Sequence, residues 1–273
     1  MDGLPTVLFV HGAWHASEHF APVQSELASH GYSIKAVQLP SSTDGNNYIQ
    51  GIDEDVEAIQ NTLSDIVLTD GDIVLVMHSY GGIPGSSAAK GFSKPERLAK
   101  GENGGIIHLI YIASFALEEG LCLIDGIGGQ LAPWVKVHVL ALYFCLLPPA
   151  FEAVGLITSI QGENTYMTPK NPRDVFYNDL SDSEAALWIS ELRKQATKSF
   201  VAPTTYAAWK HIPSTYVICE RDNAFPSFAQ EMLVSQQGAK FNVIRFEDSG
   251  HSPFLSKPQE TAKVIRKAAG ECK

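Results

Sequence analysis

The chain has 273 residues, of which 45% are hydrophobic and 18% are charged, as in a globular protein with a sizeable core. Thirty acidic residues against twenty basic ones give a formal net charge of −10, which argues against nucleic acid and anionic membranes as partners. One domain of this length is common among α/β folds.

Apolar runs and amphipathic stretches alternate through most of the chain, and they predict strands and helices respectively. In chain order we predict a strand at 6–10, a helix at 17–31, strands at 33–39 and 73–77 separated by a helix at 48–68, a helix at 85–89, strands at 106–113, 215–219 and 241–246, and helices at 227–237 and 257–269. This order implies an α/β fold with a mostly parallel, doubly wound sheet covered by helices on both faces.

Residues 116–199 interrupt the alternation, and we interpret them as an inserted, mainly helical cap. The core would then consist of residues 1–115 and 200–273. Within the cap we predict a proline-containing loop near 167–172 and a helix over 183–195. The uncharged stretch at 139–151 is too short to span a membrane and contains two prolines. We expect it to be buried in the cap or, alternatively, to form a homodimer contact.

The sequence around Ser79 predicts a nucleophile elbow, a sharp turn that presents a serine hydroxyl above the edge of a sheet. An apolar strand ends directly before Ser79, and a stretch of small residues that resembles a tightly packed helix follows it. Gly81 has no Cβ that would keep the turn from closing. Met77 stands where the usual G-x-S-x-G pattern has its first glycine. The alternative is an ordinary turn serine beside a core strand.

Two further residues follow the ends of later strands and complete a possible catalytic triad. Asp222 lies three residues beyond the strand at 215–219, and His251 follows the strand at 241–246. His251 would take the proton of Ser79 during attack, and Asp222 would orient the imidazole. Glu220 and Asp248 are nearby carboxylates that remain alternatives to Asp222.

The loop after the first strand, His11-Gly12-Ala13-Trp14, ends at the same edge of the sheet. The backbone N–H groups of Ala13 and Tyr80 are therefore candidates for an oxyanion hole. We assign substrate contacts to Trp14, His15 and Trp134, with packing inside the cap as the alternative role of Trp134.

No metal or cofactor is expected. His, Asp and Glu residues show no metal-ligand spacing, and the chain has no glycine-rich phosphate loop. The four cysteines are widely spaced without a C-x-x-C pair, and the N-terminus has no charged leader or apolar signal core. We therefore predict a cytoplasmic protein without disulfides.

Four segments give the chain a resemblance to the α/β-hydrolase superfamily, within its small single-domain esterase and hydroxynitrile-lyase-like group. These are VLFVHGAWH (7–15), VMHSYGG (76–82), TYVICERDNAFP (215–226) and EDSGHSPFLSKP (247–258). The resemblance covers the predicted core and implies only that a cap exists. The chain also resembles fungal hydrolases that act on polyketide-type esters and lactones, which would imply a role in secondary metabolism.

The favoured reaction is hydrolysis of a carboxylic ester, lactone or thioester of a small to medium apolar substrate through an acyl-enzyme. Intramolecular acyl transfer that closes a lactone would use the same triad. A hydrolase-fold binding protein with little turnover is a third hypothesis. Hydroxynitrile lyase activity is disfavoured, because Gly12 and Ser252 stand where plant lyases of this group have threonine and lysine.

Overall fold

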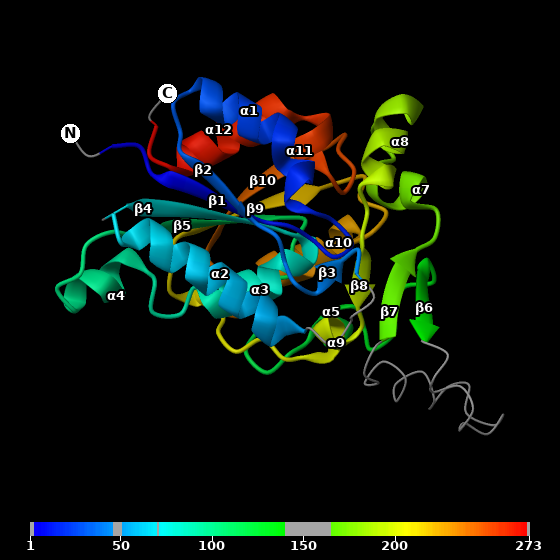
Figure 1. Ribbon diagram of the computed structural model, residues 1–273, viewed down its shortest axis with the longest axis horizontal. Helices are drawn as coiled ribbons and strands as arrows, with labels where there is room; N and C mark the ends of the chain where they lie inside the picture. Colours follow the sequence, from blue (N-terminus) through cyan, green and yellow to red (C-terminus); the bar gives the residue numbers. More distant parts are fainter. Residues whose placement is uncertain (1–2, 46–50, 70, 140–164, 272–273) are drawn as a thin grey trace.

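The computed structural model describes residues 3–45, 51–69, 71–139 and 165–271. Within this part of the chain, six parallel strands form a sheet in the order β10-β9-β5-β4-β1-β2 (Figure 1). The strands are β1 (Thr6–Val10), β2 (Ile34–Val37), β4 (Asp72–His78), β5 (Gly105–Ile112), β9 (Ser214–Cys219) and β10 (Phe241–Phe246). This arrangement confirms the predicted α/β fold.

Helices cover both faces of the sheet, as predicted for a doubly wound fold. The helices α1 (Ala21–Ser29), α11 (Pro253–Ser256) and α12 (Pro258–Ala268) lie on one face. On the opposite face lie α2 (Ile52–Val67), α3 (Gly82–Ala88) and α4 (Lys94–Ala99) (Figure 1). The helix α10 (Ser227–Val234) connects β9 to β10, and the 3-10 turn η1 (Ser17–Phe20) precedes α1.

The central strand β4 pairs with β1 on one side and β5 on the other. From Ile73 to His78 every residue of β4 is buried, because helices pack on both faces of the sheet. The carboxyl end of β4, which Ser79 directly follows, is therefore buried and is fixed by strand pairing on both sides.

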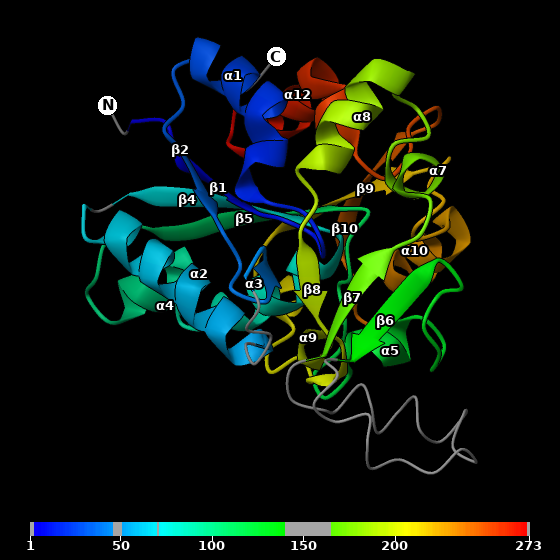
Figure 2. The same ribbon diagram turned by 45° about the vertical axis from the view of Figure 1, so that its right-hand side comes forward.

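The inserted segment differs from the prediction, because three of its strands, together with β3 of the predicted core, form a second, antiparallel sheet in the order β3-β8-β7-β6 (Figure 2). Its strands are β3 (Ser42–Thr43), β8 (Lys194–Ala196), β7 (Thr165–Pro169) and β6 (Val135–Val139). The insertion also carries the short helices α5 (Leu123–Gly126), α7 (Pro172–Phe176), α8 (Asp182–Ser190) and α9 (Lys198–Val201). The cap is thus a mixed structure rather than a mainly helical one.

In the cap, one local prediction is wrong and another is right only for part of its length. The segment predicted as a loop at 167–172 begins in strand β7 and ends at the start of α7. The helix predicted over 183–195 ends at Ser190, and the chain then enters strand β8. In both places a strand forms only through pairing with distant segments, which a local pattern does not reveal.

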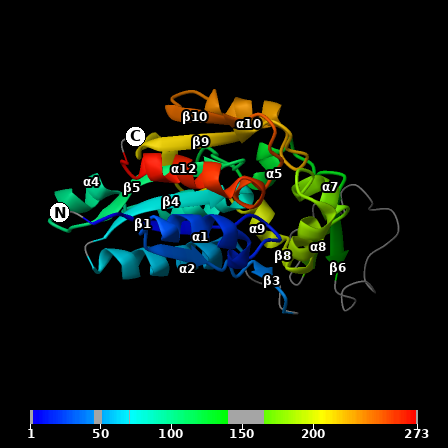
Figure 3. The same cartoon turned by 90° about the horizontal axis from the view of Figure 1, so that it is seen from above.

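The cap lies beyond the carboxyl ends of the parallel strands (Figures 1 and 3). Strand β3 belongs to the predicted core by its position in the sequence, yet it pairs with β8 of the insertion. Apart from Val139, the uncharged stretch at 139–151 lies outside the described residues. Among the helices that are described, none is long and apolar enough to cross a membrane.

Candidate active site

Ser79 occupies a sharp turn between β4 and α3, as the elbow prediction requires. Its φ angle is +51°, a left-handed value that non-glycine residues adopt infrequently. The carbonyl oxygen of Ser79 accepts hydrogen bonds from Ser114 Oγ at 2.8 Å and from the Phe115 backbone N–H at 3.1 Å. These two bonds hold the turn in a conformation that exposes the side chain of Ser79.

Two glycines make the turn sterically possible. A Cβ on Gly81 would lie 2.6 Å from the carbonyl oxygen of His11, which is closer than real Cβ atoms approach. A Cβ on Gly85 would lie 2.6 Å from the sulfur of Met77. Met77 is therefore compatible with the elbow although it replaces the usual glycine, because its thioether fills the space that Gly85 leaves on α3.

The structure brings His251 and Asp222 together in a buried pair. His251 Nδ1 lies 2.7 Å from Asp222 Oδ2, and both side chains are at most 2% exposed. Because the carboxylate accepts a hydrogen bond from Nδ1–H, the lone pair of His251 Nε2 is left for accepting a proton.

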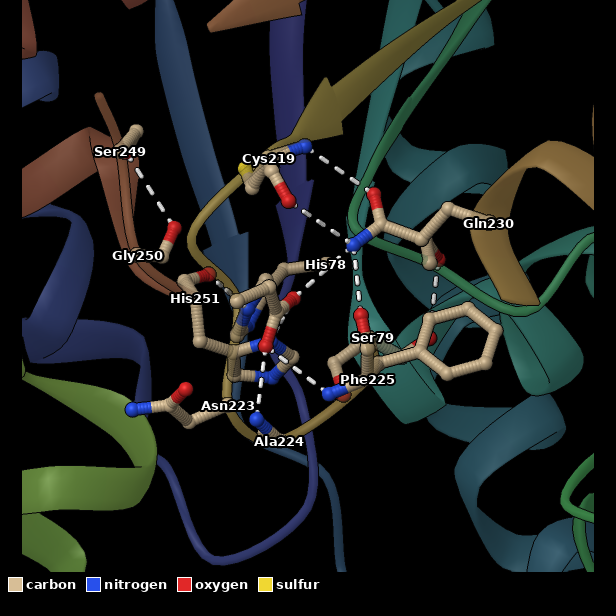
Figure 4. A network of polar contacts seen from close by, with 12 residues as sticks. His78, Ser79, Cys219, Asn223, Ala224, Phe225, Gln230, Ser249, Gly250 and His251 are labelled. Carbon is tan, nitrogen blue, oxygen red and sulfur yellow. Dashed lines mark hydrogen bonds and ion pairs between the residues drawn. The ribbon is translucent and has the colours of Figure 1, made fainter. Parts of the chain in front are cut away.

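Three further donors fix the Asp222 carboxylate (Figure 4). The backbone N–H groups of Ala224 and Phe225 each donate to Oδ1 at 2.8 Å. The buried amide of Gln230, on α10, donates to Oδ2 at 3.1 Å and also bonds Cys219 N–H at the end of β9. Sequence reasoning missed Gln230, because a glutamine within a helix gives no functional signal by itself.

The alternative carboxylates have other partners. Glu220 accepts a hydrogen bond from Arg245 at 2.8 Å. Asp248 forms an ion pair with Lys257 at 2.9 Å. Of the three acidic residues considered for the triad, Asp222 is the one that hydrogen-bonds His251.

Ser79 and His251 line one pocket together with Ala13 and Tyr80. The cavity has a volume of about 40 Å³, far below the roughly 300–1,000 Å³ of typical sites for drug-sized ligands. Its remaining lining is almost entirely apolar and comes from the core and the cap, with Phe115, Leu123, Ile127, Val135, Phe176 and Phe225 among its members. Such a pocket suits the reacting end of an apolar molecule.

The predicted substrate contacts divide into two groups. Trp14 and Trp134 both line the pocket, and their rings pack edge to face with centroids 5.4 Å apart. His15 lies outside the residues that line it. The ring of His15 is buried, with Nδ1 2.8 Å from the Ala13 carbonyl and Nε2 3.2 Å from the Tyr177 hydroxyl. The structure therefore does not bring His15 to the position that a substrate contact requires.

Several other buried histidines surround the site without adding positive charge. Burial lowers the pKa of His11 to about 3 and that of His19 to about 4. Burial also lowers the pKa values of His15 and His78 well below their usual range. These side chains are neutral at pH 7, since the apolar surroundings disfavour the charged imidazolium.

A segment of the cap contacts the loop that carries His251. Asp179 Oδ2 accepts hydrogen bonds from Gly250 N–H at 2.8 Å, Ser256 Oγ at 2.7 Å and Ser249 Oγ at 3.2 Å. Sequence reasoning missed Asp179, because its partners lie some seventy positions away along the chain. Among the described residues, no cluster of His, Cys, Asp or Glu is suited to holding a metal ion.

The sequence profile of the alpha/beta hydrolase family matches residues 7–264. The chain belongs to this family. The alpha/beta hydrolase nvfD of Aspergillus novofumigatus is 36% identical over 267 residues, covering 98% of this chain and 97% of that protein. Methylesterase 18 of Arabidopsis thaliana is 25% identical over 96% of both chains.

The same fold occurs in a solved structure of polyneuridine aldehyde esterase. It superposes on this hydrolase with a TM-score of 0.74 and 16% identity, covering 97% of this chain and 99% of the other. The two curated relatives are named as a hydrolase and a methylesterase, in agreement with an ester hydrolase.

Proposed function

We propose that this hydrolase cleaves a carboxylic ester of a small to medium apolar acid, with Ser79 as nucleophile, His251 as general base and Asp222 as the residue that orients it. The observation that carries the proposal is the buried His251–Asp222 pair at 2.7 Å, whose histidine lines the same apolar pocket as Ser79, a serine with a φ angle of +51°. The methylesterase relatives make methyl and other short alkyl esters the first substrates to test.

In the proposed mechanism, Ser79 Oγ attacks the ester carbonyl carbon while His251 Nε2 takes the hydroxyl proton. The backbone N–H groups of Ala13 and Tyr80 stabilise the oxyanion that forms. The carbon–oxygen bond to the leaving alcohol then breaks, and His251 returns the proton to that oxygen. Water repeats the sequence on the acyl-enzyme, releasing the acid and restoring the Ser79 hydroxyl.

Lactones and thioesters fit the same chemistry, since each presents a carbonyl with a leaving oxygen or sulfur. Intramolecular acyl transfer differs only in the second step, where a substrate hydroxyl replaces water. The products separate these reactions: hydrolysis gives a free acid, whereas acyl transfer gives a lactone. A role in fungal-type secondary metabolism, a cytoplasmic location and a homodimer contact through residues 139–151 also remain proposals. Size-exclusion chromatography at micromolar concentration tests the dimer.

The decisive test is the intact mass of the protein after brief incubation with a fluorophosphonate. We expect one adduct on the wild type and none on Ser79→Ala. Ser86→Ala is the matched control, because it removes another buried serine hydroxyl, on helix α3. Activity toward methyl esters should disappear only with Ser79→Ala. A wild type that forms no adduct and hydrolyses no ester would favour the binding-protein alternative.

A further inference from the structure

A buried acidic residue outside the triad lies next to the nucleophile turn. Asp55, on helix α2, is 0% exposed, and no ion pair involves it within the described residues. Its carboxylate accepts three hydrogen bonds, from Ser41 N–H at 2.9 Å, Ser41 Oγ at 2.5 Å and Tyr80 Oη at 2.6 Å. Burial without a cation raises the pKa of Asp55 to about 6. Burying an acid in this way costs free energy that an apolar residue would not.

One branch from Asp55 reaches the residue after the nucleophile. Tyr80 is fully buried, and its hydroxyl donates to Asp55 while its backbone follows Ser79. Holding the phenol ring at its far end restricts how the Tyr80 peptide can rotate. That peptide carries one of the two N–H groups assigned to the oxyanion.

A second branch reaches the loop after β1. Gln195 Nε2, on the cap strand β8, donates to Ser41 Oγ at 2.8 Å. Gln195 Oε1 in turn accepts the backbone N–H of Trp14 at 3.1 Å. Trp14 directly follows Ala13 and has a φ angle of +63°, so this bond stabilises an infrequent backbone conformation. Because Gln195 takes the Trp14 N–H, Ala13 is the residue of this loop whose N–H is assigned to the oxyanion.

We propose that Asp55 and Gln195 are positioning residues that hold both peptide segments of the oxyanion hole through Tyr80 and Trp14. The proposal rests on the proposed function, since it assumes Ser79 as nucleophile and Ala13 and Tyr80 as donors. Stabilisation of an oxyanion depends on donors at 2.7–3.1 Å from the place where the charge develops. A network fixed at two buried points keeps both donors at that distance before substrate arrives.

Tyr80→Phe is the cleanest test, because it removes one hydroxyl and leaves the peptide in place. Tyr111→Phe is the matched control: Tyr111 is equally buried, and its hydroxyl bonds Ser86 at 2.7 Å, away from the pocket lining. We expect Tyr80→Phe to lower kcat on a short-chain p-nitrophenyl ester about tenfold, with KM within twofold. The Ki of a trifluoromethyl ketone, which mimics the tetrahedral intermediate, should rise by a similar factor. Tyr111→Phe should change neither quantity by more than twofold.

Gln195→Met tests the other branch, because it keeps the side-chain length and removes both polar atoms. It should raise the Ki of the ketone about tenfold, and it decides the question if Tyr80→Phe does not fold. Equal effects of Tyr80→Phe and Tyr111→Phe on kcat and Ki, or an unchanged Ki in Gln195→Met, would overturn the positioning role. Ser79→Ala is measured alongside. If it retains activity, the proposed function fails, and the positioning role that depends on it fails too; if only Ser79→Ala loses activity, the positioning role alone is wrong.

Discussion

Replacement of Asp222 by asparagine tests the proposed triad most sharply, because the structure dictates how the new amide must sit. The backbone N–H groups of Ala224 and Phe225 both donate to Oδ1 and cannot become acceptors, whereas His251 beside Oδ2 can change tautomer, so we expect the amide oxygen of asparagine at Oδ1. The amide NH₂ then occupies the position of Oδ2, 2.7 Å from His251 Nδ1. Two donors cannot share that contact, and His251 must move its proton to Nε2.

This tautomer has no lone pair on the nitrogen that is proposed to accept the Ser79 proton. We therefore expect kcat to fall by about 10⁴, the effect of this exchange in Ser-His-Asp triads. That loss corresponds to about 5 kcal/mol of activation free energy. The fold should survive, since the N–H groups of Ala224 and Phe225 keep their acceptor, and Gln230 loses one hydrogen bond but keeps the one to the Phe225 carbonyl.

The assay is steady-state hydrolysis of a p-nitrophenyl ester, together with the rate of fluorophosphonate modification of Ser79. Glu220→Gln and Asp248→Asn are controls that remove neighbouring charges paired with Arg245 and Lys257. Each should stay within about twofold of the wild type, since exposed ion pairs contribute little. If Asp222→Asn keeps more than a tenth of the wild-type kcat while Glu220→Gln or Asp248→Asn does not, the assignment of Asp222 is wrong.

Three further substitutions probe the surroundings of the site. Gly81→Ala places a Cβ 2.6 Å from a backbone oxygen of the loop after β1, and should lower soluble yield and Tm; an unchanged Tm contradicts the steric argument. Asp179→Ala removes the acceptor of the Gly250 N–H, and should lower Tm by about 5 °C and reduce kcat, as calorimetry and kinetics can check. Asp55 has a pKa of about 6, raised mainly by burial and slightly by Glu54. The native state then binds this proton more tightly than the unfolded chain, so wild-type stability falls by about 2 kcal/mol as pH rises from 4 to 7. The free energy of unfolding of Asp55→Asn, measured in urea, should not show that decline. The same pH dependence in the wild type and in the variant would refute the raised pKa of Asp55 as its cause.

The core could be predicted from the sequence because each of its strands and helices has a recognisable pattern in its own residues. Strands buried on both faces are continuous apolar runs, and β4 is the clearest case. Since parallel strands end at one edge of the sheet, the residues that follow β1, β4, β9 and β10 had to lie near one another. That reasoning placed Ser79, Asp222 and His251 together without any knowledge of the contacts.

The cap sheet could not be predicted in the same way. Strand β8 has three residues and β3 has two, too few for an alternating pattern. Strand β7 contains three polar residues or prolines among five, and forms by pairing with β6 and β8. Its signal lies in tertiary contacts that the local sequence does not contain.

Asp55 did leave a signal that the sequence analysis passed over. It lies three residues after Ile52 and four before Ile59, on the apolar face of the helix predicted over 48–68. A carboxylate on such a face loses its contacts with water, so it must accept hydrogen bonds from other residues or be buried at a high cost in free energy. The structure shows the second case, with Ser41 and Tyr80 as partners.

The pairing of β3 with β8 has a consequence for how this enzyme can diversify. Leu123, Ile127 and Trp134 line the pocket from the insertion, so exchanges there can reshape substrate preference while the reacting groups stay unchanged. Gln195 differs, because it lies on β8, which pairs with β3, and its side chain donates a hydrogen bond to Ser41 beside β3. A chimera that carries the whole insertion of another protein would lose the pairing of β3 with β8 and the hydrogen bond between Gln195 and Ser41. We therefore expect chimeras to fold only when residues 41–43 are exchanged together with the insertion that contains β8.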